Sequence, residues 1–380
     1  MIHPPKPFPP MTNSNDRFAY TRRDALKLSA AALGFSFFAK MFPAYADADA
    51  ITNATINSVG EMVSGAKFKK DGPYRIGFSN GFSGNTWRTE MLASIKKEAA
   101  QHKDLGDLII VDGQGDITKQ VNDIESLVSQ NVDAILCIAN SGSAVAPVLR
   151  DATKQGIVTV PFNLPVDGEA WTAYIGTDPE KKGNGLGKWL RGALNDSGKI
   201  VALGGLPGNS YTASAWKGAQ NAFAGSKIEV LAFKDAYWEE DKAKVVMADL
   251  IAAYPDIDGV WCDGSQVAAG AMKALLAAKR PLVPVTGDDY NGLLKLFGQE
   301  SANQPKFKIG LLSEPTWESV VALRTALNLL SGKDVAKRQV IEPKLITVEN
   351  YKTYVRPELP DGVFVDTSLS EEELKQLFKA

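Results

Sequence analysis

Short apolar segments alternate with helical periods along most of this 380-residue chain, and they form two similar series. Segments expected to be strands lie at 75–78, 108–111, 134–138, 158–160 and 173–175, and then at 200–203, 229–233, 260–262, 283–285 and 308–311. Helical periods occur between them, for example at 87–101, 117–130 and 241–254. This order is typical of parallel sheets with right-handed crossovers. We therefore expect an α/β fold with doubly wound parallel sheets.

An internal repeat indicates that the two series are copies of one unit. The segment Asp133–Cys137 recurs as Asp258–Cys262, an offset of 258 − 133 = 125 residues. The same offset links residues of other predicted strands and strand ends: Ile76 with Val201, Val160 with Val285, and Asn163 with Asp288. The sequence therefore predicts two similar α/β lobes.

The segment Tyr74–Met91 combines a predicted buried strand, a loop dense in Gly, Ser and Asn, and the start of a helix. Loops of this kind lie at the carboxyl edge of an open α/β sheet, where ligands bind. Asn85 can cap the helix and still turn its amide toward a ligand. Trp87 places a large apolar surface where a loop is normally polar. It either stacks on a ligand or completes a local core, and this segment alone does not decide between the two.

The first 46 residues resemble an export signal. Thr21–Lys27 contains the paired arginines of a twin-arginine signal, although Ala25 stands where that motif usually has an aromatic residue. Ala44-Tyr45-Ala46 has the pattern of a cleavage site, and no cysteine follows it to carry a lipid anchor. An ordinary general-secretion signal is the alternative. Either route predicts a diffusible periplasmic protein that is cleaved after Ala46.

Composition narrows the class of protein. The formal net charge is −2, and removing residues 1–46 leaves 36 basic and 42 acidic side chains, or 36 − 42 = −6. This acidic balance argues against a nucleic-acid partner. After residue 46 no uncharged apolar stretch is long enough to span a membrane. Cys137 and Cys262 fall in predicted strands of different lobes, so we expect two core residues, not a disulfide.

In order and in residues, the chain resembles the ribose-type (type I) periplasmic sugar-binding proteins, the solute receptors of bacterial ABC importers. The resemblance covers about residues 74–345. No single motif carries it. It is carried by five short motifs in order: Ile76–Ser79 with Asn85–Trp87, Tyr174–Asp178, Gly204–Ser210, Tyr254–Val260 and Val285–Asp289.

The resemblance implies two lobes that close on a ligand about three hinge crossings. It places the crossings near residues 176–178, 312–314 and 341–344, with Gly176, Asp178 and Glu314 as hinge residues. Asp178 could instead cap the helix that follows it. The implied division is lobe one at 71–176 and 314–340, and lobe two at 177–313 and 341–350.

Two segments fall outside the resemblance in the mature chain. Residues 47–70 form an N-terminal lead, in which 56–66 has a weak amphipathic helical pattern. Residues 351–380 form a C-terminal tail that is expected to be extended to residue 366. Ser370 and Glu373 then have the spacing of a capping box that opens a last short helix.

A sugar offers apolar faces and a rim of hydroxyls, so flat aromatic side chains with Asp, Asn and Gln suit it. The resemblance implies that Trp87 of lobe one and Trp238 of lobe two stack on the ligand. The other residues expected to bind it follow predicted strands or open helices: Asn85, Arg88, Asn163, Ser210, Asp263, Gln266, Asp288 and Ser313.

The sequence departs from the family pattern at positions that bear on which ligand is bound. Leu164 and Ala213 stand where the family's ribose binders have arginines, and Gly264-Ser265 replaces a usual Asn-Asp pair. These changes argue against ribose itself and leave a sugar or polyol as the expected ligand. A pocket rich in carboxylates and poor in arginine would also accept an amino-bearing compound.

Other classes of function have little support in the sequence. After residue 46 the chain has one histidine, His102, so a His-based metal site or catalytic triad is excluded. Gly183–Gly187 lacks the spacing of a dinucleotide fingerprint. We expect no enzyme, no metal and no cofactor, and a monomer in solution.

The same bilobed core also serves as the effector domain of sugar-responsive repressors. Such proteins are cytoplasmic and begin with a helix-turn-helix, which this export signal argues against. A receptor that delivers its ligand to an ABC permease is the main hypothesis. A receptor that presents the ligand to a membrane chemoreceptor or sensor kinase is the alternative.

Overall fold

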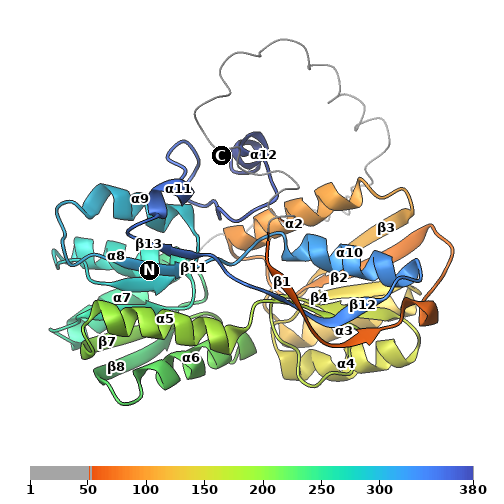
Figure 1. The fold of residues 1–380 in the computed structure, drawn as a ribbon, viewed down its shortest axis with the longest axis horizontal. Coiled ribbons are helices and arrows are strands. Elements are labelled where there is room, and N and C mark those ends of the chain that lie inside the picture. The colour runs from red at the N-terminus through yellow and green to blue at the C-terminus, as the bar shows by residue number, and fades with distance from the viewer. Residues whose placement is uncertain (1–50, 52–53, 380) are drawn as a thin grey trace, which may run out of the picture. The chain divides into compact units, whose positions relative to one another are not determined.

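The computed structural model describes residue 51 and residues 54–379 (Figure 1). The expected export signal, its cleavage site and the first part of the lead lie outside the described residues. Within the described part of the chain, no helix is long and apolar enough to cross a membrane.

Lobe one is built on a parallel sheet in the order β3-β2-β4-β5, drawn in orange and yellow in Figure 1. We include in it the helices that cover this sheet and the strands β6 and β12. Its elements are β2 (Tyr74–Asn80), α2 (Thr86–Ala99), β3 (Leu105–Asp112), α3 (Ile117–Ser129), β4 (Ala134–Ile138), α4 (Gly142–Lys154), β5 (Val158–Pro161), β6 (Tyr174–Gly176), α10 (Glu318–Leu330) and β12 (Val335–Ile341).

Strand β4 shows why this sheet is apolar on both faces. Ala134, Leu136 and Ile138 belong to the core that includes α2, whereas Ile135 and Cys137 pack with residues of α3 and α4. Successive side chains of a strand point to opposite faces, so a strand between two helical layers must be apolar throughout.

Lobe two has a sheet in the order β13-β11-β10-β9-β7-β8, in which β13 is antiparallel to β11. Helices α5 and α6 pack together, as do α7 and α8. Its elements are α5 (Pro179–Ala193), β7 (Ser197–Gly204), α6 (Ser210–Phe223), β8 (Lys227–Asp235), α7 (Glu240–Ala253), β9 (Gly259–Cys262), α8 (Ser265–Ala277), β10 (Val285–Gly287), α9 (Asn291–Glu300), β11 (Ile309–Leu312) and β13 (Leu345–Thr347). The α/β fold with parallel-sheet lobes that the sequence predicts is confirmed.

The repeat is real in topology, although its spacing varies by one residue. Ile76 of β2 pairs with Ala134 of β4, and Ile200 of β7 pairs with Gly259 of β9. The offset is therefore 259 − 134 = 125 for the second strand and 200 − 76 = 124 for the first. Ile76 thus corresponds to Ile200 and not, as the constant offset suggested, to Val201. Both expected core cysteines are free and buried.

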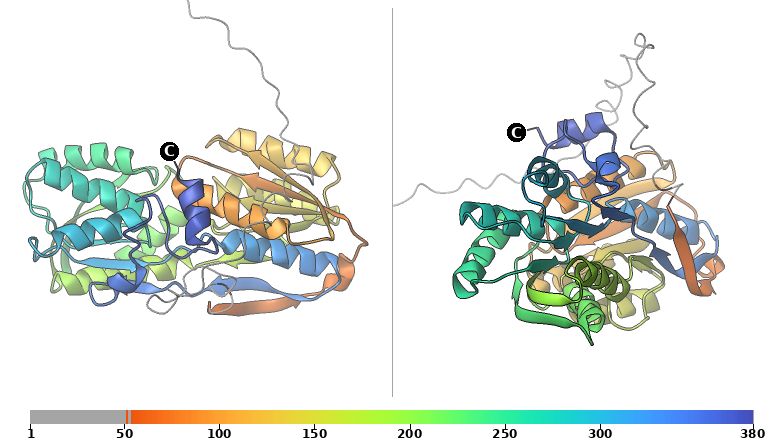
Figure 2. Two further views of the ribbon diagram at one scale, coloured as in Figure 1. Left: turned by 90° about the horizontal axis from the view of Figure 1, so that it is seen from above. Right: turned by 60° about the vertical axis from the view of Figure 1, so that its left-hand side comes forward.

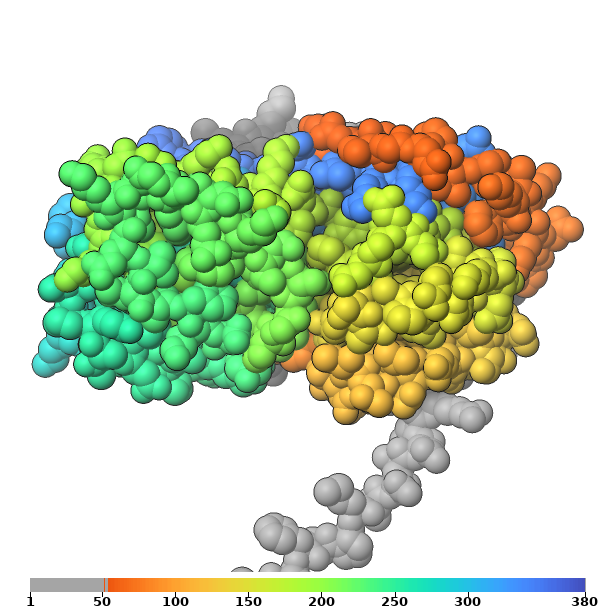
Figure 3. Space-filling model, turned by 90° about the horizontal axis from the view of Figure 1, so that it is seen from below, coloured from red at the N-terminus to blue at the C-terminus, as the bar shows by residue number. Residues whose placement is uncertain are grey.

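The lead contains a strand where the sequence suggested a helix. β1 (Ile56–Val63) pairs antiparallel with β12, in a small sheet of order β1-β12-β6, and a short 3-10 turn, η2 (Gly65–Lys67), follows. In Figure 3, β1 lies in orange beside the blue chain at the upper edge. Most β1 side chains are exposed. The conformation of β1 is therefore determined by hydrogen bonding to β12, which lies far away in the sequence. A local sequence pattern does not show such a pairing.

The C-terminal residues pack on both lobes. The expected extended stretch begins instead with a short helix, α11 (Tyr351–Tyr354), which lies near β13. The final helix, α12 (Glu371–Leu377), packs on α2, as the view from above in Figure 2 shows. Ser370 and Glu373 form the predicted capping box. We call residues 355–370, which join these two helices, the C-terminal strap.

Candidate ligand-binding site

A pocket lies between the two lobes, and residues of both lobes line it. Most of its walls are residues of the loops and helix starts that come after strands β2, β5, β8, β9, β10 and β11, because parallel strands end at one edge of a sheet. The lining residues are Asn85, Trp87, Asn163, Leu164, Tyr211, Trp238, Asp263, Gly264, Gln266, Asp288, Glu314 and Phe364.

The two tryptophans are held by hydrogen bonds from their indole nitrogens. Trp87 Nε1 donates to the carbonyl oxygen of Glu314 at 2.8 Å, and Trp238 Nε1 donates to Asp263 Oδ1 at 3.0 Å. Trp238 has a φ of 53°, a backbone conformation that is costly for a residue other than glycine. The backbone of Gly205 packs on its indole, where a Cβ would lie 2.1 Å from Cε2. The fold therefore fixes the Trp238 ring against the pocket.

Two aspartates of lobe two supply acceptors. Asp263 Oδ2 accepts from the Thr212 hydroxyl at 2.7 Å, and Asp288 Oδ1 accepts from the backbone nitrogen of Ser265 at the start of α8 at 2.8 Å. Burial raises the pKa of each carboxyl to about 6. Both still present oxygen atoms to the pocket, so they can accept from ligand hydroxyls.

Glu314, on the segment between β11 and α10, lines the pocket and connects the lobes. Its carboxylate accepts from Asn163 Nδ2 of lobe one at 2.7 Å and from the Tyr211 hydroxyl of lobe two at 2.7 Å. It also forms an ion pair with Lys182 of α5, and both side chains are almost fully buried. Burial alone would lower the pKa of Lys182, but Glu314 and Asp288 outweigh it and raise that pKa.

Direct contacts also join the lobes around the rim of the pocket. The Ser210 hydroxyl donates to the carbonyl oxygen of Pro165 at 3.0 Å, and Gln266 Nε2 lies 3.3 Å from the Thr86 hydroxyl oxygen. Gln266 lines the pocket, and the other three residues are next to lining residues in the sequence. The pocket is therefore bordered by both lobes and not by one alone.

Most of the residues expected from sequence meet in this pocket: Asn85, Trp87, Asn163, Trp238, Asp263, Gln266 and Asp288. Three do not line it. Arg88 is buried in lobe one, where Nη1 donates to Asn80 Oδ1 at 2.8 Å and burial lowers its pKa to about 9. Ser210 bridges the lobes as described. The Ser313 hydroxyl donates to Asp366 Oδ2 at 2.9 Å.

The three residues expected at the hinge crossings lie at different places in the fold. Gly176 ends β6, and Asp178 caps α5 by accepting from the backbone nitrogen of Lys181 at 3.0 Å. Glu314 lines the pocket itself.

Sequence reasoning missed Tyr211 and Phe364 as lining residues. Tyr211 directly follows the Gly204–Ser210 motif and could have been included. Phe364 is in the tail, where no pattern indicated a role.

A family model described as a periplasmic binding protein domain matches residues 76–334. The ribose import binding protein of Bacillus subtilis is 27% identical over 262 residues, which are 68% of this chain and 84% of that protein. The xylitol-binding protein of Mycolicibacterium smegmatis is 28% identical over 64% of this chain and 69% of its own length.

Among solved structures, the fructose-binding periplasmic domain of a hybrid two-component system is similar, with a TM-score of 0.67 and 25% identity. The match covers 73% of this chain and 92% of that one.

Proposed function

Because the chain belongs to the periplasmic binding protein family and has its type I fold, we propose that it captures a sugar or polyol between its lobes and delivers it to an ABC import permease. The observation that carries this proposal is the pocket, in which Trp87, Trp238 and several carboxylate and amide side chains from both lobes meet. Flat apolar surface with convergent hydroxyl partners is the chemistry that a polyhydroxylated ring or chain requires.

The details of the lining favour a neutral polyhydroxyl ligand. None of the described lining residues is an arginine or a lysine. Two buried cations contact lining residues: Lys182 is paired with Glu314, and Arg88, beside Trp87, donates to Asn80. An anionic ligand would therefore find no free cation at these residues. The relatives named above bind ribose and xylitol, which agrees with this ligand class.

We propose the sensory receptor as the second candidate. One observation favours it: the structural relative with the fructose-binding domain belongs to a two-component system. Both candidates use the same ligand pocket, so they differ only in the membrane partner. Neither requires catalysis, and we propose that the protein is not an enzyme and acts as a monomer.

Export follows from the same proposal. We expect the mature protein to begin at Asp47 after a signal of the twin-arginine kind. Intact-mass analysis of the periplasmic fraction from the native host checks this start. A cytosolic protein that retains Met1 would contradict it.

The proposed function is tested with a thermal-shift panel of pentoses, hexoses, deoxysugars, polyols and nucleosides, with amino sugars as a comparison. A ligand at about 100 times its Kd stabilises the folded state by about 2.7 kcal/mol. At least one neutral sugar or polyol should raise the melting temperature. A panel in which only cationic compounds act, or none does, would overturn the proposal. Uptake of the radiolabelled hit by cells with and without the receptor gene then separates import from sensing.

A further inference from the structure

We propose that the C-terminal strap is part of the ligand site and that Phe364 is a ligand-contacting residue that determines specificity. This inference rests on the proposed function, because it takes the pocket between the lobes to be the sugar or polyol site. The strap lies beyond residues 76–334 that match the family model, so the family resemblance does not describe it.

The buried side chain of Asn291 attaches the strap to lobe two. Asn291, at the start of α9, donates from Nδ2 to the carbonyl oxygens of Arg356 and Pro360 at 2.8 and 3.1 Å. Its Oδ1 accepts from the backbone nitrogen of Arg356 at 2.9 Å. Its own backbone nitrogen donates to the carbonyl oxygen of Val363 at 2.7 Å. Because the oxygen and the nitrogen of the Asn291 amide both bind the strap backbone, this side chain fixes the conformation of the strap.

Lobe one holds the next residue of the strap. Glu90 of α2, which is buried, accepts from the backbone nitrogen of Phe364 at 2.8 Å through Oε1. The backbone of Gly362 lies against Thr86, since a Cβ on this glycine would be 3.1 Å from Thr86 Cγ2. The strap therefore passes from lobe two to lobe one beside the first turn of α2, which also carries Trp87.

The crossing between β11 and α10 holds the strap from a third side. Asp289 Oδ2 accepts from the backbone nitrogen of Asp366 at 2.6 Å, and its Oδ1 accepts from that of Glu314 at 2.8 Å. The Asp366 carboxylate in turn accepts from the Ser313 hydroxyl at 2.9 Å and from Trp317 Nε1 at 3.1 Å. One buried aspartate thus binds both the strap and the crossing that presents Glu314 to the pocket.

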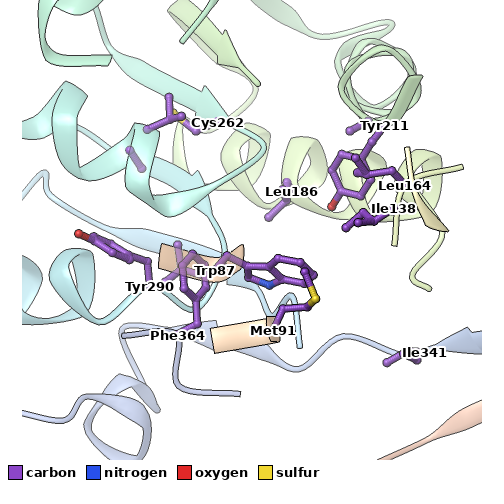
Figure 4. Close-up of a cluster of buried hydrophobic side chains, with 14 of the residues drawn as sticks. Trp87, Met91, Ile138, Leu164, Leu186, Tyr211, Cys262, Tyr290, Ile341 and Phe364 are labelled. Atoms are coloured by element: carbon purple, nitrogen blue, oxygen red, sulfur yellow. The ribbon is translucent and has the colours of Figure 1, made fainter. Parts of the chain in front are cut away.

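These attachments place the Phe364 ring in the pocket wall. The ring packs on Tyr290 at a centroid distance of 5.6 Å, and the two residues also form an antiparallel bridge. In Figure 4 Phe364 lies next to Trp87, and Tyr211 and Leu164 lie on the other side of that indole. All but Tyr290 line the pocket. Phe364 is 2% exposed, so little of the ring is open to bulk solvent.

The position of Phe364 predicts what it does for recognition. An aromatic ring beside Trp87 adds apolar surface for the C–H groups of a ligand and occupies space that a longer ligand would need. Phe364 therefore favours a compact monosaccharide or short polyol and disfavours larger relatives. Specificity of this kind arises from a wall that excludes competitors as well as from bonds that attract the ligand.

The test uses the full-length mature protein and three variants, with Kd measured by titration calorimetry and stability measured by melting. The ligands are the best hit of the sugar and polyol panel and a graded series that extends it, up to disaccharides. Phe364→Ala removes the ring. Phe364→Leu keeps an apolar contact with Tyr290 and keeps the variant folded if the alanine variant is not. Leu369→Ala is the matched control, because Leu369 is equally buried on the same strap but packs in a separate cluster with Leu359 and Leu374.

We expect both Phe364 variants to weaken binding of the best ligand by on the order of tenfold or more and to move the preference toward larger members of the series. Leu369→Ala should lower the melting temperature and leave Kd and preference unchanged. If the Phe364 variants keep wild-type Kd and preference, or change them only as Leu369→Ala does, the inference is overturned while the proposed function stands. A wild-type protein that binds no member of the panel overturns the proposed function and this inference together.

Discussion

The buried ion pair between Glu314 and Lys182 should be one of the most sensitive points of the molecule. Lys182 is 3% exposed and Glu314 is 7% exposed, so neither charge is well solvated. Glu314→Gln keeps the shape of the side chain, but its one amide oxygen can replace only one of the two carboxylate oxygens that accept from Asn163 and Tyr211. It also leaves the ammonium of Lys182 without its counter-charge. Breaking a buried pair by removing one partner typically costs about 3–5 kcal/mol.

This magnitude can be measured as a shift in melting temperature. At roughly 2 °C per kcal/mol for a large domain, Glu314→Gln should lower the melting temperature by about 6–10 °C. Lys182→Met should also destabilise the protein, because it leaves a buried carboxylate. The double variant removes both charges, so we expect it to be more stable than the sum of the single effects predicts, by about 2–3 kcal/mol.

An exposed pair on the same helix supplies the control. Lys181 is next to Lys182 and pairs with Glu342, and its side chain is 64% exposed. Lys181→Met should change stability by less than about 1 kcal/mol, because solvent screens exposed pairs. If Glu314→Gln melts with the wild-type protein, or if the two single effects simply add, the argument that this pair holds the lobes together is refuted.

Three further predictions concern the pocket. Trp87→Ala and Trp238→Ala should each weaken ligand binding by about 2–3 kcal/mol, since each removes on the order of 100 Å² of apolar contact, and calorimetry that finds near-wild-type Kd for both would contradict stacking. Asp288→Ala removes a charged acceptor and should lose more affinity than Asn163→Ala, which removes a neutral one, because a charged acceptor contributes about 1.5–3 kcal/mol against about 1 kcal/mol for a neutral one; the reverse order in titrations would oppose this. Burial raises the pKa of Asp263 and Asp288 to about 6, above their unfolded value, so their contribution to stability is present below about pH 4 and is lost as the pH rises through about 6. Affinity should change in the opposite direction and fall on acidification through about pH 6, because ligand hydroxyls donate best to ionised carboxylates; a pH-independent Kd between about pH 5 and 7.5 would contradict this.

Local pattern was enough to predict the lobes, because the central strands of their sheets are buried on both faces. The run Ala134–Ile138 has to be apolar throughout, and its strand has the expected bounds. The same reasoning failed for β1, whose side chains are mostly exposed and whose conformation depends on pairing with β12. A strand with no buried face leaves little trace in the local sequence.

The pocket was predictable where a residue ends a strand, and less so elsewhere. Asp263 and Asp288 each directly follow a strand, so topology brings them together. Arg88 opens a helix beside Trp87 and was expected to face the ligand, but it lies in the core of lobe one with Asn80. Residues that neighbour each other at the start of a helix point in different directions, and the sequence does not show which of them faces the cleft. Phe364 lies in the pocket wall because tertiary contacts position the strap. Neither the internal repeat nor a helical or strand period in the sequence predicts those contacts.

We propose that Glu314 couples ligand binding to the position of the lobes without a long pathway. Its carbonyl oxygen holds Trp87 of lobe one, its carboxylate holds Tyr211 and Lys182 of lobe two, and its backbone nitrogen is held by Asp289. The residue thus lies at once in the pocket wall and in a crossing between the lobes. A ligand shifts an equilibrium between conformations only by as much as it binds them differently. A ligand that binds Glu314, or that changes the hydrogen bonds of Trp87 or Tyr211 to Glu314, acts directly on the crossing between the lobes. Such a ligand distinguishes the arrangements of the lobes through contacts within the pocket itself.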